Sequence, residues 1–194
     1  GSAGYYRDDI ASPQFDPKYD VAGTAIRQPG SAWKPIVYTA GFDARVVTPG
    51  TLFSDVITEF SRDWFPRDAD RKERGPVLMR DALTYSLNIP AIRALERTGN
   101  EAVAAQAERM GIRFQGGTNA FLQAGLAGAI GTVEVRPLDL TSAYGTLANG
   151  GVRVPPRLIL EVRDAAGNVV WKAPEPAGEQ VLSPGTAFLV TDIL

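Results

Sequence analysis

The chain has 194 residues, of which 44% are hydrophobic and 22% are charged, and its formal net charge is −2 at pH 7. This composition is ordinary for one globular domain with a substantial core. The near-neutral charge gives no electrostatic reason to expect nucleic acid or an anionic membrane surface as a main partner.

Two absent residue types restrict the possible chemistry further. The sequence contains no cysteine, which excludes disulfides, thiol nucleophiles and thiolate metal sites. It contains no histidine, which excludes a Ser-His-Asp triad, a Cys-His pair and any His-ligated zinc site. A catalytic serine would therefore need another base. Because arginine stays protonated, that base would come from the few lysines, which are Lys18, Lys34, Lys72 and Lys172.

The first half of the chain predicts one helix between two irregular segments. Residues 1–25 carry glycines, prolines and scattered aspartates, so we expect loop structure there. Apolar residues at helical spacing after the Pro29-Gly30 turn predict a helix over 31–43. Residues 45–76 mix prolines, glycine and charge with short β-branched runs, which predicts a long surface excursion with one short strand. Excursions of this kind often border a site.

The middle of the chain predicts three consecutive helices, over 77–86, 90–98 and 100–110. A break is expected at 88–90, because Pro90 suits the first turn of a helix and disfavours helical angles at Ile89. This places residues 86–88 at a joint between two helices. The glycine-rich residues 114–135 are predicted to form a loop.

The last third predicts a helix over 136–148, stopped by Asn149-Gly150, then a hairpin turning at 164–168. A final helix begins at Pro184 and is capped by Ser183. It ends on apolar residues without a stop signal, so we expect the chain to be cut inside a domain. No apolar run approaches the roughly 20 residues of a membrane span, and no signal-peptide pattern opens the chain.

Ser31 and Lys34 stand three positions apart, which places a hydroxyl and an amine on one helix face. A lysine can take the proton of a serine if burial or neighbouring positive charge keeps the amine partly neutral. The helix N-terminus would also favour developing negative charge. Alternatively, Ser31 is a helix N-cap and Lys34 a solvated first-turn lysine, because an S-x-x-K match arises by chance in a chain of this length.

Ser86 and Asn88 also have two interpretations. They could end one helix and form an ordinary turn, since Ser and Asn are common turn residues. The surroundings of all four residues favour a site instead.

The segment 27–38, RQPGSAWKPIVY, resembles the active-serine segment of class A penicillin-binding proteins, the peptidoglycan transpeptidases. Residues 78–95, LMRDALTYSLNIPAIRAL, resemble the second motif of that family, S-x-N, in its usual setting. Residues 133–151 and 181–194 resemble the later stretches of the same family in the same order. The third motif, K-T-G, is not found in this sequence.

The resemblance implies a mixed α/β (α+β) fold. The chain would supply the helix-rich part of the penicillin-binding transpeptidase fold and a β-hairpin, while much of the central antiparallel sheet lies outside it. Residues 1–194 would then form a partial transpeptidase domain, truncated at both ends and before K-T-G.

The resemblance also implies the activity, a peptidoglycan D,D-transpeptidase acting through an acyl-enzyme. Ser31 would attack the D-Ala-D-Ala bond of a stem peptide, with Lys34 as base, Ser86 as proton relay and Asn88 as a hydrogen-bonding partner of Lys34 and substrate. An amine of a neighbouring strand would accept the acyl group, and β-lactams would acylate Ser31. No cofactor or metal is implied. The parent protein would be membrane-anchored, carry a glycosyltransferase domain and act on the extracytoplasmic face of the bacterial membrane.

The motifs are also compatible with other functions. A D,D-carboxypeptidase or β-lactamase would use water as the acceptor, and a non-catalytic penicillin-binding or scaffold fragment would keep the motifs without the reaction. The glycines of 124–131 do not fit a dinucleotide fingerprint. The run 67–75, RDADRKERG, lacks a full calcium loop and is expected to be a solvated charge run. Aromatic residues are expected in the core or cleft walls, namely Trp33, Trp64, Phe65 and Trp171.

Overall fold

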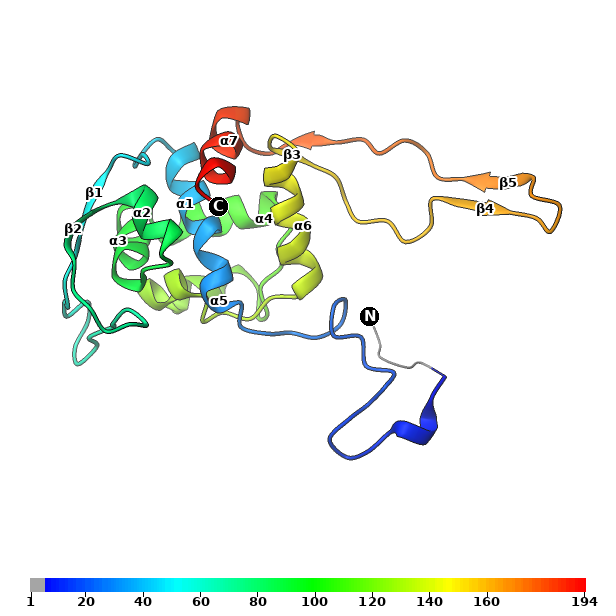
Figure 1. The fold of residues 1–194 in the computed structure, drawn as a ribbon, viewed down its shortest axis with the longest axis horizontal. Coiled ribbons are helices and arrows are strands. Elements are labelled where there is room, and N and C mark those ends of the chain that lie inside the picture. Colours follow the sequence, from blue (N-terminus) through cyan, green and yellow to red (C-terminus); the bar gives the residue numbers. More distant parts are fainter. Residues whose placement is uncertain (1–5) are drawn as a thin grey trace.

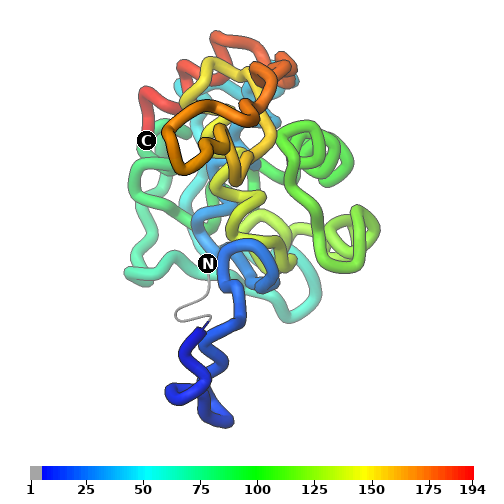
Figure 2. The backbone as a smooth tube through the Cα atoms, turned by 90° about the vertical axis from the view of Figure 1, so that its right-hand side faces the viewer, coloured from blue at the N-terminus to red at the C-terminus, as the bar shows by residue number. Residues whose placement is uncertain are grey.

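The computed structural model describes residues 6–194. Its helices gather into one body, from which a long β-hairpin and the N-terminal segment project (Figure 1). A view turned by a right angle shows the N-terminal segment running away from the body (Figure 2). Among residues 6–194, no helix combines the length and apolar character needed to cross a bilayer.

The helical elements follow the chain from the N-terminal segment to the C-terminal helix. Short 3-10 helices precede α1, and a third, η3, follows α5. Their bounds are η1 Asp8–Ile10, η2 Gly30–Trp33, α1 Lys34–Asp43, α2 Met79–Thr84, α3 Asn88–Thr98, α4 Asn100–Arg109, α5 Thr118–Gln123, η3 Gly125–Ile130, α6 Pro137–Ala148 and α7 Pro184–Ile193.

Helix α1 forms the centre of the body. Every residue from Lys34 to Phe42 is buried, and the helix packs against α3, α4 and α7. A helix without a solvent-facing side belongs in a core, where neighbours cover it all round. A polar side chain on α1 must therefore find its partners inside the protein.

The strands form three two-stranded antiparallel sheets within the described residues. The pairs are β1 Leu52–Asp55 with β2 Gly75–Leu78, β3 Val152–Arg153 with β6 Glu179–Gln180, and β4 Glu161–Arg163 with β5 Val169–Lys172. The mixed fold class is confirmed. The excursion after α1 carries two strands rather than the predicted one, because its two ends pair with each other, Leu52 opposite Leu78.

Several predicted elements are confirmed. The helix over 31–43 is present, although its first turn is the 3-10 helix η2. The hairpin turns where expected, with the Asp164 carboxylate accepting hydrogen bonds from the amides of Ala166 and Asn168. The Ser183 hydroxyl caps α7 by accepting from the Thr186 amide at 3.1 Å. Residues 6–25 are largely irregular, and the predicted loop residues 1–5 lie outside the described residues.

Two further element predictions are wrong. Helix α3 begins at Asn88 rather than Pro90, so Ile89 is helical despite the proline after it. Pro90 is tolerated because it lies in the first turn of α3, where a backbone N–H group would have no partner within the helix. The glycine-rich residues 114–135 contain α5 and η3, because Gly117 and Gly131, both at positive φ, bound a helical segment that buries Phe121.

An aromatic cluster supports the turn that carries Ser31. The Trp33 ring lies 5.6 Å from the ring of Phe114 and 5.5 Å from that of Phe121, centroid to centroid. All three side chains are buried. This packing fixes η2 at the start of α1. By contrast, Trp171 lies on the projecting hairpin and is 47% exposed, and Phe65 is 50% exposed, so neither side chain lies in the core.

Candidate active site

Lys34 is the buried centre of the candidate site. Its side chain is fully buried at the first position of α1. The ammonium Nζ donates to the Ser86 hydroxyl at 3.1 Å, to Asn88 Oδ1 at 2.7 Å and to the Ser86 carbonyl. A lysine ammonium has three N–H donors, so each has an acceptor. The alternative of a solvated first-turn lysine is therefore wrong.

Ser86 is held by the end of α2. Its φ of 55° lies in the left-handed region, which a residue other than glycine seldom adopts. The amide of Ser86 donates to Leu83 O, and the amide of Leu87 donates to Ala82 O. These two bonds form a Schellman motif with Ser86 at its left-handed position. The motif turns both the carbonyl and the hydroxyl of Ser86 toward Lys34.

Asn88 is held from the other side by the excursion between β1 and β2. Its Nδ2 donates to the Arg67 carbonyl at 2.7 Å, which leaves Oδ1 to accept from Lys34. Its backbone amide donates to the Asp68 carboxylate, and the Ile89 amide donates to the same oxygen at 3.3 Å. Asp68 is thus the cap of α3, supplied from a segment twenty residues earlier in the chain.

Ser31 lies in η2, one turn before Lys34, and its side chain is exposed. Within residues 6–194 its hydroxyl has no hydrogen-bond partner, so it neither caps the helix nor bonds to Lys34 in this structure. The Gly30 amide donates to Gly131 O at 3.2 Å, and Tyr144 donates through its hydroxyl to Ala32 O at 2.9 Å. The backbone on both sides of Ser31 is therefore fixed while the hydroxyl faces solvent.

Burial lowers the pKa of Lys34 to about 8, although the negative charge of Asp68 acts in the opposite direction. Burial disfavours the ammonium because it loses hydration, whereas a nearby carboxylate favours it. A lysine with this pKa is neutral in an appreciable fraction of molecules near pH 7, which ordinary lysines are not. Such an amine can accept a proton from a serine hydroxyl.

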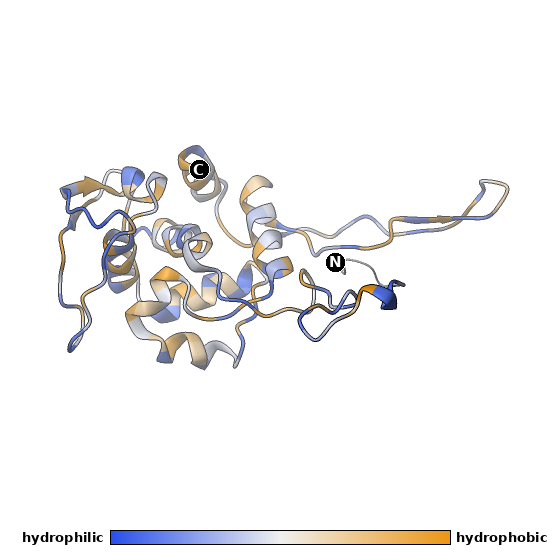
Figure 3. Cartoon of the chain, turned by 60° about the horizontal axis from the view of Figure 1, so that its bottom comes forward, coloured by the Kyte–Doolittle hydropathy of each residue, from blue (hydrophilic) through white to orange (hydrophobic). Residues whose placement is uncertain are grey.

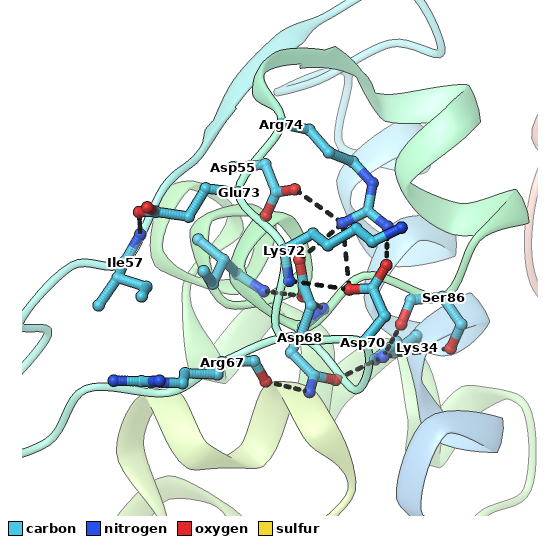
Figure 4. Close-up of polar contacts among 12 residues, drawn as sticks. Lys34, Asp55, Ile57, Arg67, Asp68, Asp70, Lys72, Glu73, Arg74 and Ser86 are labelled. Carbon is cyan, nitrogen blue, oxygen red and sulfur yellow. Dashed lines mark hydrogen bonds and ion pairs between the residues drawn. The ribbon is translucent and has the colours of Figure 1, made fainter.

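The structure gathers three of the four residues predicted from the sequence into one cluster, namely Lys34, Ser86 and Asn88, with Ser31 on the adjoining turn. Sequence reasoning missed Asp68, because the run 67–75 was predicted to be solvated and Asp68 is only 4% exposed. Asp55 and Arg74 accompany it (Figure 4). The feature of the sequence that could have indicated Asp68 is a charged loop that lies between two short strands and shortly before the S-x-N motif.

The described residues hold no group of three or more acidic, histidine or cysteine side chains arranged for a metal ion. The donors of the site are hydroxyl, amine, amide and carbonyl groups. Hydroxyl and amine groups of this kind can act as nucleophiles and transfer protons.

Comparisons with known proteins identify the family of this chain. A family model for the penicillin binding protein transpeptidase domain matches residues 8–194. The chain is 32% identical over 181 residues to penicillin-binding protein 1A of Aquifex aeolicus, covering 91% of this chain and 24% of that protein. It is 33% identical over 174 residues to penicillin-binding protein 1F of Bacillus subtilis, covering 88% of this chain and 23% of that protein. The chain thus spans about a quarter of the length of these relatives.

Solved structures share the fold. The crystal structure of penicillin-binding protein 1A from Haemophilus influenzae superposes with a TM-score of 0.81 at 24% identity, covering 91% of this chain and 30% of that one. Penicillin-binding protein A from M. tuberculosis, in an acyl-enzyme complex with ceftriaxone, gives a TM-score of 0.82 at 20% identity, covering 91% and 44%. With the family model matched over 8–194 and the buried lysine joined to its S-x-N residues, this chain belongs to the penicillin-binding protein transpeptidase family.

Proposed function

We propose that this chain supplies the nucleophile and base of a peptidoglycan D,D-transpeptidase that acts through an acyl-enzyme on Ser31. The observation that carries the proposal is the buried Lys34, which has a lowered pKa and is held to Ser86 and Asn88 beside an exposed Ser31. A merely structural lysine gains nothing from burial, because its ammonium is stabilised best by water.

In the proposed first half-reaction, neutral Lys34 takes the proton of the Ser31 hydroxyl as Oγ attacks the carbonyl between the last two D-alanines. The tetrahedral intermediate then collapses, and its C–N bond breaks. The leaving amine receives a proton from Lys34 through the Ser86 hydroxyl, which lies 3.1 Å from Nζ. Free D-alanine departs and the stem peptide remains as an ester on Ser31.

In the second half-reaction, an amine of a neighbouring strand attacks the ester and passes a proton to Lys34. The ester C–O bond breaks, and Ser31 recovers its proton from the same lysine. Asn88, fixed by Arg67 and Asp68, keeps Lys34 oriented and offers its amide to the acyl chain. If water takes the place of the amine, the products are those of a D,D-carboxypeptidase.

β-Lactams enter the proposal as acylating agents, since two of the structurally similar chains are acyl-enzyme complexes with ceftriaxone and imipenem. In this proposal the strained lactam amide takes the place of the D-Ala-D-Ala bond, and Ser31 retains the opened ring as an ester. For the whole protein we propose a membrane anchor, a glycosyltransferase domain and a location on the extracytoplasmic face of the bacterial membrane, as the resemblance to class A penicillin-binding proteins implies.

The activity is tested with the full-length protein, a stem pentapeptide ending in D-Ala-D-Ala and an acceptor amine. We expect D-alanine release and a cross-linked product, both lost in Ser31→Ala. Release of D-alanine without cross-linking would identify a carboxypeptidase. Neither product from folded protein supplied with both substrates would leave a non-catalytic scaffold.

A further inference from the structure

A buried carboxylate lies directly behind the S-x-N residues. Asp68 is 4% exposed, although the loop residues on both sides of it are exposed. One of its oxygens accepts from the amides of Asn88 and Ile89, the first two residues of α3. The other oxygen lies 3.5 Å from an Arg74 nitrogen. A buried charge with partners on two sides is held in one orientation.

Arg74 fastens this carboxylate to the sheet formed by β1 and β2. The guanidinium contacts Asp55 at 3.3 Å, Asp68 at 3.5 Å and Asp70 at 2.5 Å (Figure 4). Asp55 is the last residue of β1, and the Arg74 amide donates to its carbonyl at 3.0 Å. These contacts connect the loop between the two strands to the end of β1.

Asp68, held by Arg74, acts on Lys34 and Asn88 in two separable ways. By geometry, Asp68 fixes the first turn of α3, and Asn88 in turn accepts from Lys34 at 2.7 Å. By charge, Asp68 favours the ammonium form of Lys34 and opposes ionisation of the buried Tyr38 hydroxyl. Three charged groups close to Asp68, namely Asp55, Asp70 and Arg74, are joined to one another through Arg74.

We propose that Asp68 is a positioning residue for acylation at Ser31: its carboxylate, anchored by Arg74, sets the place of Asn88 and the charge balance of Lys34. This inference rests on the proposed function, because it concerns the same nucleophile, Ser31, and the same base, Lys34. It adds a residue that lies outside the S-x-x-K and S-x-N motifs. Substrate does not need to touch Asp68 for the effect to operate.

Two variants separate geometry from charge. Asp68→Asn keeps an oxygen that can accept from the amides of Asn88 and Ile89, but it removes the charge. Asp68→Ala removes both. The matched control is Asp192→Asn, which removes one carboxylate from the exposed Arg80–Asp192 ion pair at 2.8 Å, away from Asn88. All are made in the full-length protein, and a fluorescent penicillin is the probe.

The measurement is the second-order rate of acylation between pH 6 and pH 10, with a thermal melt of each variant. For wild type we expect the rate to rise with a midpoint near the Lys34 pKa of about 8 and then to level off. Asp68→Asn should move this midpoint to lower pH, because removing a negative charge favours the neutral amine. Asp68→Ala should lower the plateau by roughly 10- to 100-fold, because Asn88 loses its fixed place.

The outcomes distinguish the two proposals. Wild-type protein that melts cooperatively but is never acylated would defeat the proposed function, and the role of Asp68 with it. Acylated wild type, with Asp68→Asn and Asp68→Ala both matching Asp192→Asn in midpoint and plateau, would overturn the positioning role alone. A lower melting temperature in Asp68→Ala without a change in rate on the folded protein would likewise reduce Asp68 to a structural cap.

Discussion

Lys34 shows how a single residue combines a structural cost with a chemical use. Its ammonium is removed from water and its three donors are all directed at Ser86 and Asn88. The sequence could predict this lysine as a candidate base, because histidine and cysteine are absent and Ser31 stands three residues before it. It could not show the burial, which depends on α3, α4 and α7 closing around α1.

Asp55 gives a stability prediction at the same scale. Burial and the neighbouring Asp68 raise its pKa from 3.8 to about 6. The folded chain therefore binds an extra proton between these values, and the stabilisation from that proton is full below about pH 4 and lost as the pH rises through 6. Asp55→Asn, which is neutral at every pH, should raise stability above pH 6 by on the order of 1–3 kcal/mol and have little effect near pH 4.

Thermal melts of the full-length protein and its Asp55→Asn variant at pH 4.5 and pH 7.5 test this. A variant that is less stable than wild type at pH 7.5 would show that the ion pair with Arg74 outweighs burial, contrary to the expectation. Asp192→Asn, which alters an exposed pair, serves as the reference and should shift the melt little at either pH.

At the scale of elements, the joint between α2 and α3 is determined by the Schellman motif that ends α2 and by the cap of α3. The sequence predicted a joint at 86–88 but placed the start of α3 two residues late, because the cap of that helix is Asp68, remote in the sequence. The local sequence around the start of a helix cannot reveal a cap that comes from a distant segment of the chain. The same limit explains α5 and η3, whose glycine-rich sequence is helical because Phe121 packs under Trp33.

Ser86 occupies a left-handed position in the Schellman motif, where glycine is preferred. Ser86→Gly should therefore be more stable than Ser86→Ala by roughly 0.5–1 kcal/mol, because both variants lose the hydroxyl that accepts from Lys34 but only glycine relieves the left-handed strain of a residue with a Cβ. It should also slow acylation, because the hydroxyl that meets Lys34 is lost. Ser86→Ala, which loses the same hydroxyl and keeps the strain, is the control.

Melting temperature and acylation rate of the two variants are compared with wild type. Ser86→Gly and Ser86→Ala should lower the acylation rate to the same extent. Ser86→Gly should have the higher melting temperature of the two. Equal melting temperatures would show that the position carries no strain, and an unchanged rate in both would remove Ser86 from the proton path.

Gly131 is a second element-level constraint, at the junction of η3 and the turn of Ser31. Its φ is +74°, and a Cβ there would stand 2.3 Å from the Gly30 carbonyl oxygen. Gly131→Ala should cost about 1–3 kcal/mol and slow acylation, because backbone rather than a flexible side chain must move. Gly145→Ala, on α6 with open space around it, should be neutral or slightly stabilising.

Urea unfolding and penicillin acylation of both glycine variants provide the readouts. If Gly131→Ala behaved like Gly145→Ala, the turn of Ser31 would be free to shift, and its fixed backbone would not be part of the mechanism.

At the scale of the whole molecule, the body is well packed but the projecting hairpin is not covered. Hydrophobic residues occur along this projecting segment (Figure 3), and the apolar side chains most exposed there are Leu158 at 100%, Leu160 at 67% and Val170 at 61%. Contiguous exposed apolar surface promotes association. Composition and motifs predicted the family and the helical body, but the sequence alone did not show which apolar residues would lie outside the core.

We therefore expect the isolated 194 residues to associate in solution rather than to behave as a stable monomer. Size-exclusion chromatography with light scattering, followed by a thermal melt, tests this. The prediction fails if the isolated chain runs as a monomer and melts in one cooperative transition.

The most direct test of the account is intact-mass spectrometry of the full-length protein after incubation with a penicillin, beside its Ser31→Ala variant. We predict one covalent adduct equal to the mass of the penicillin, absent in the variant, with the label recovered on the peptide that contains Ser31. A folded wild-type protein without an adduct, or an adduct that persists in Ser31→Ala, would contradict the assignment of Ser31 as the nucleophile.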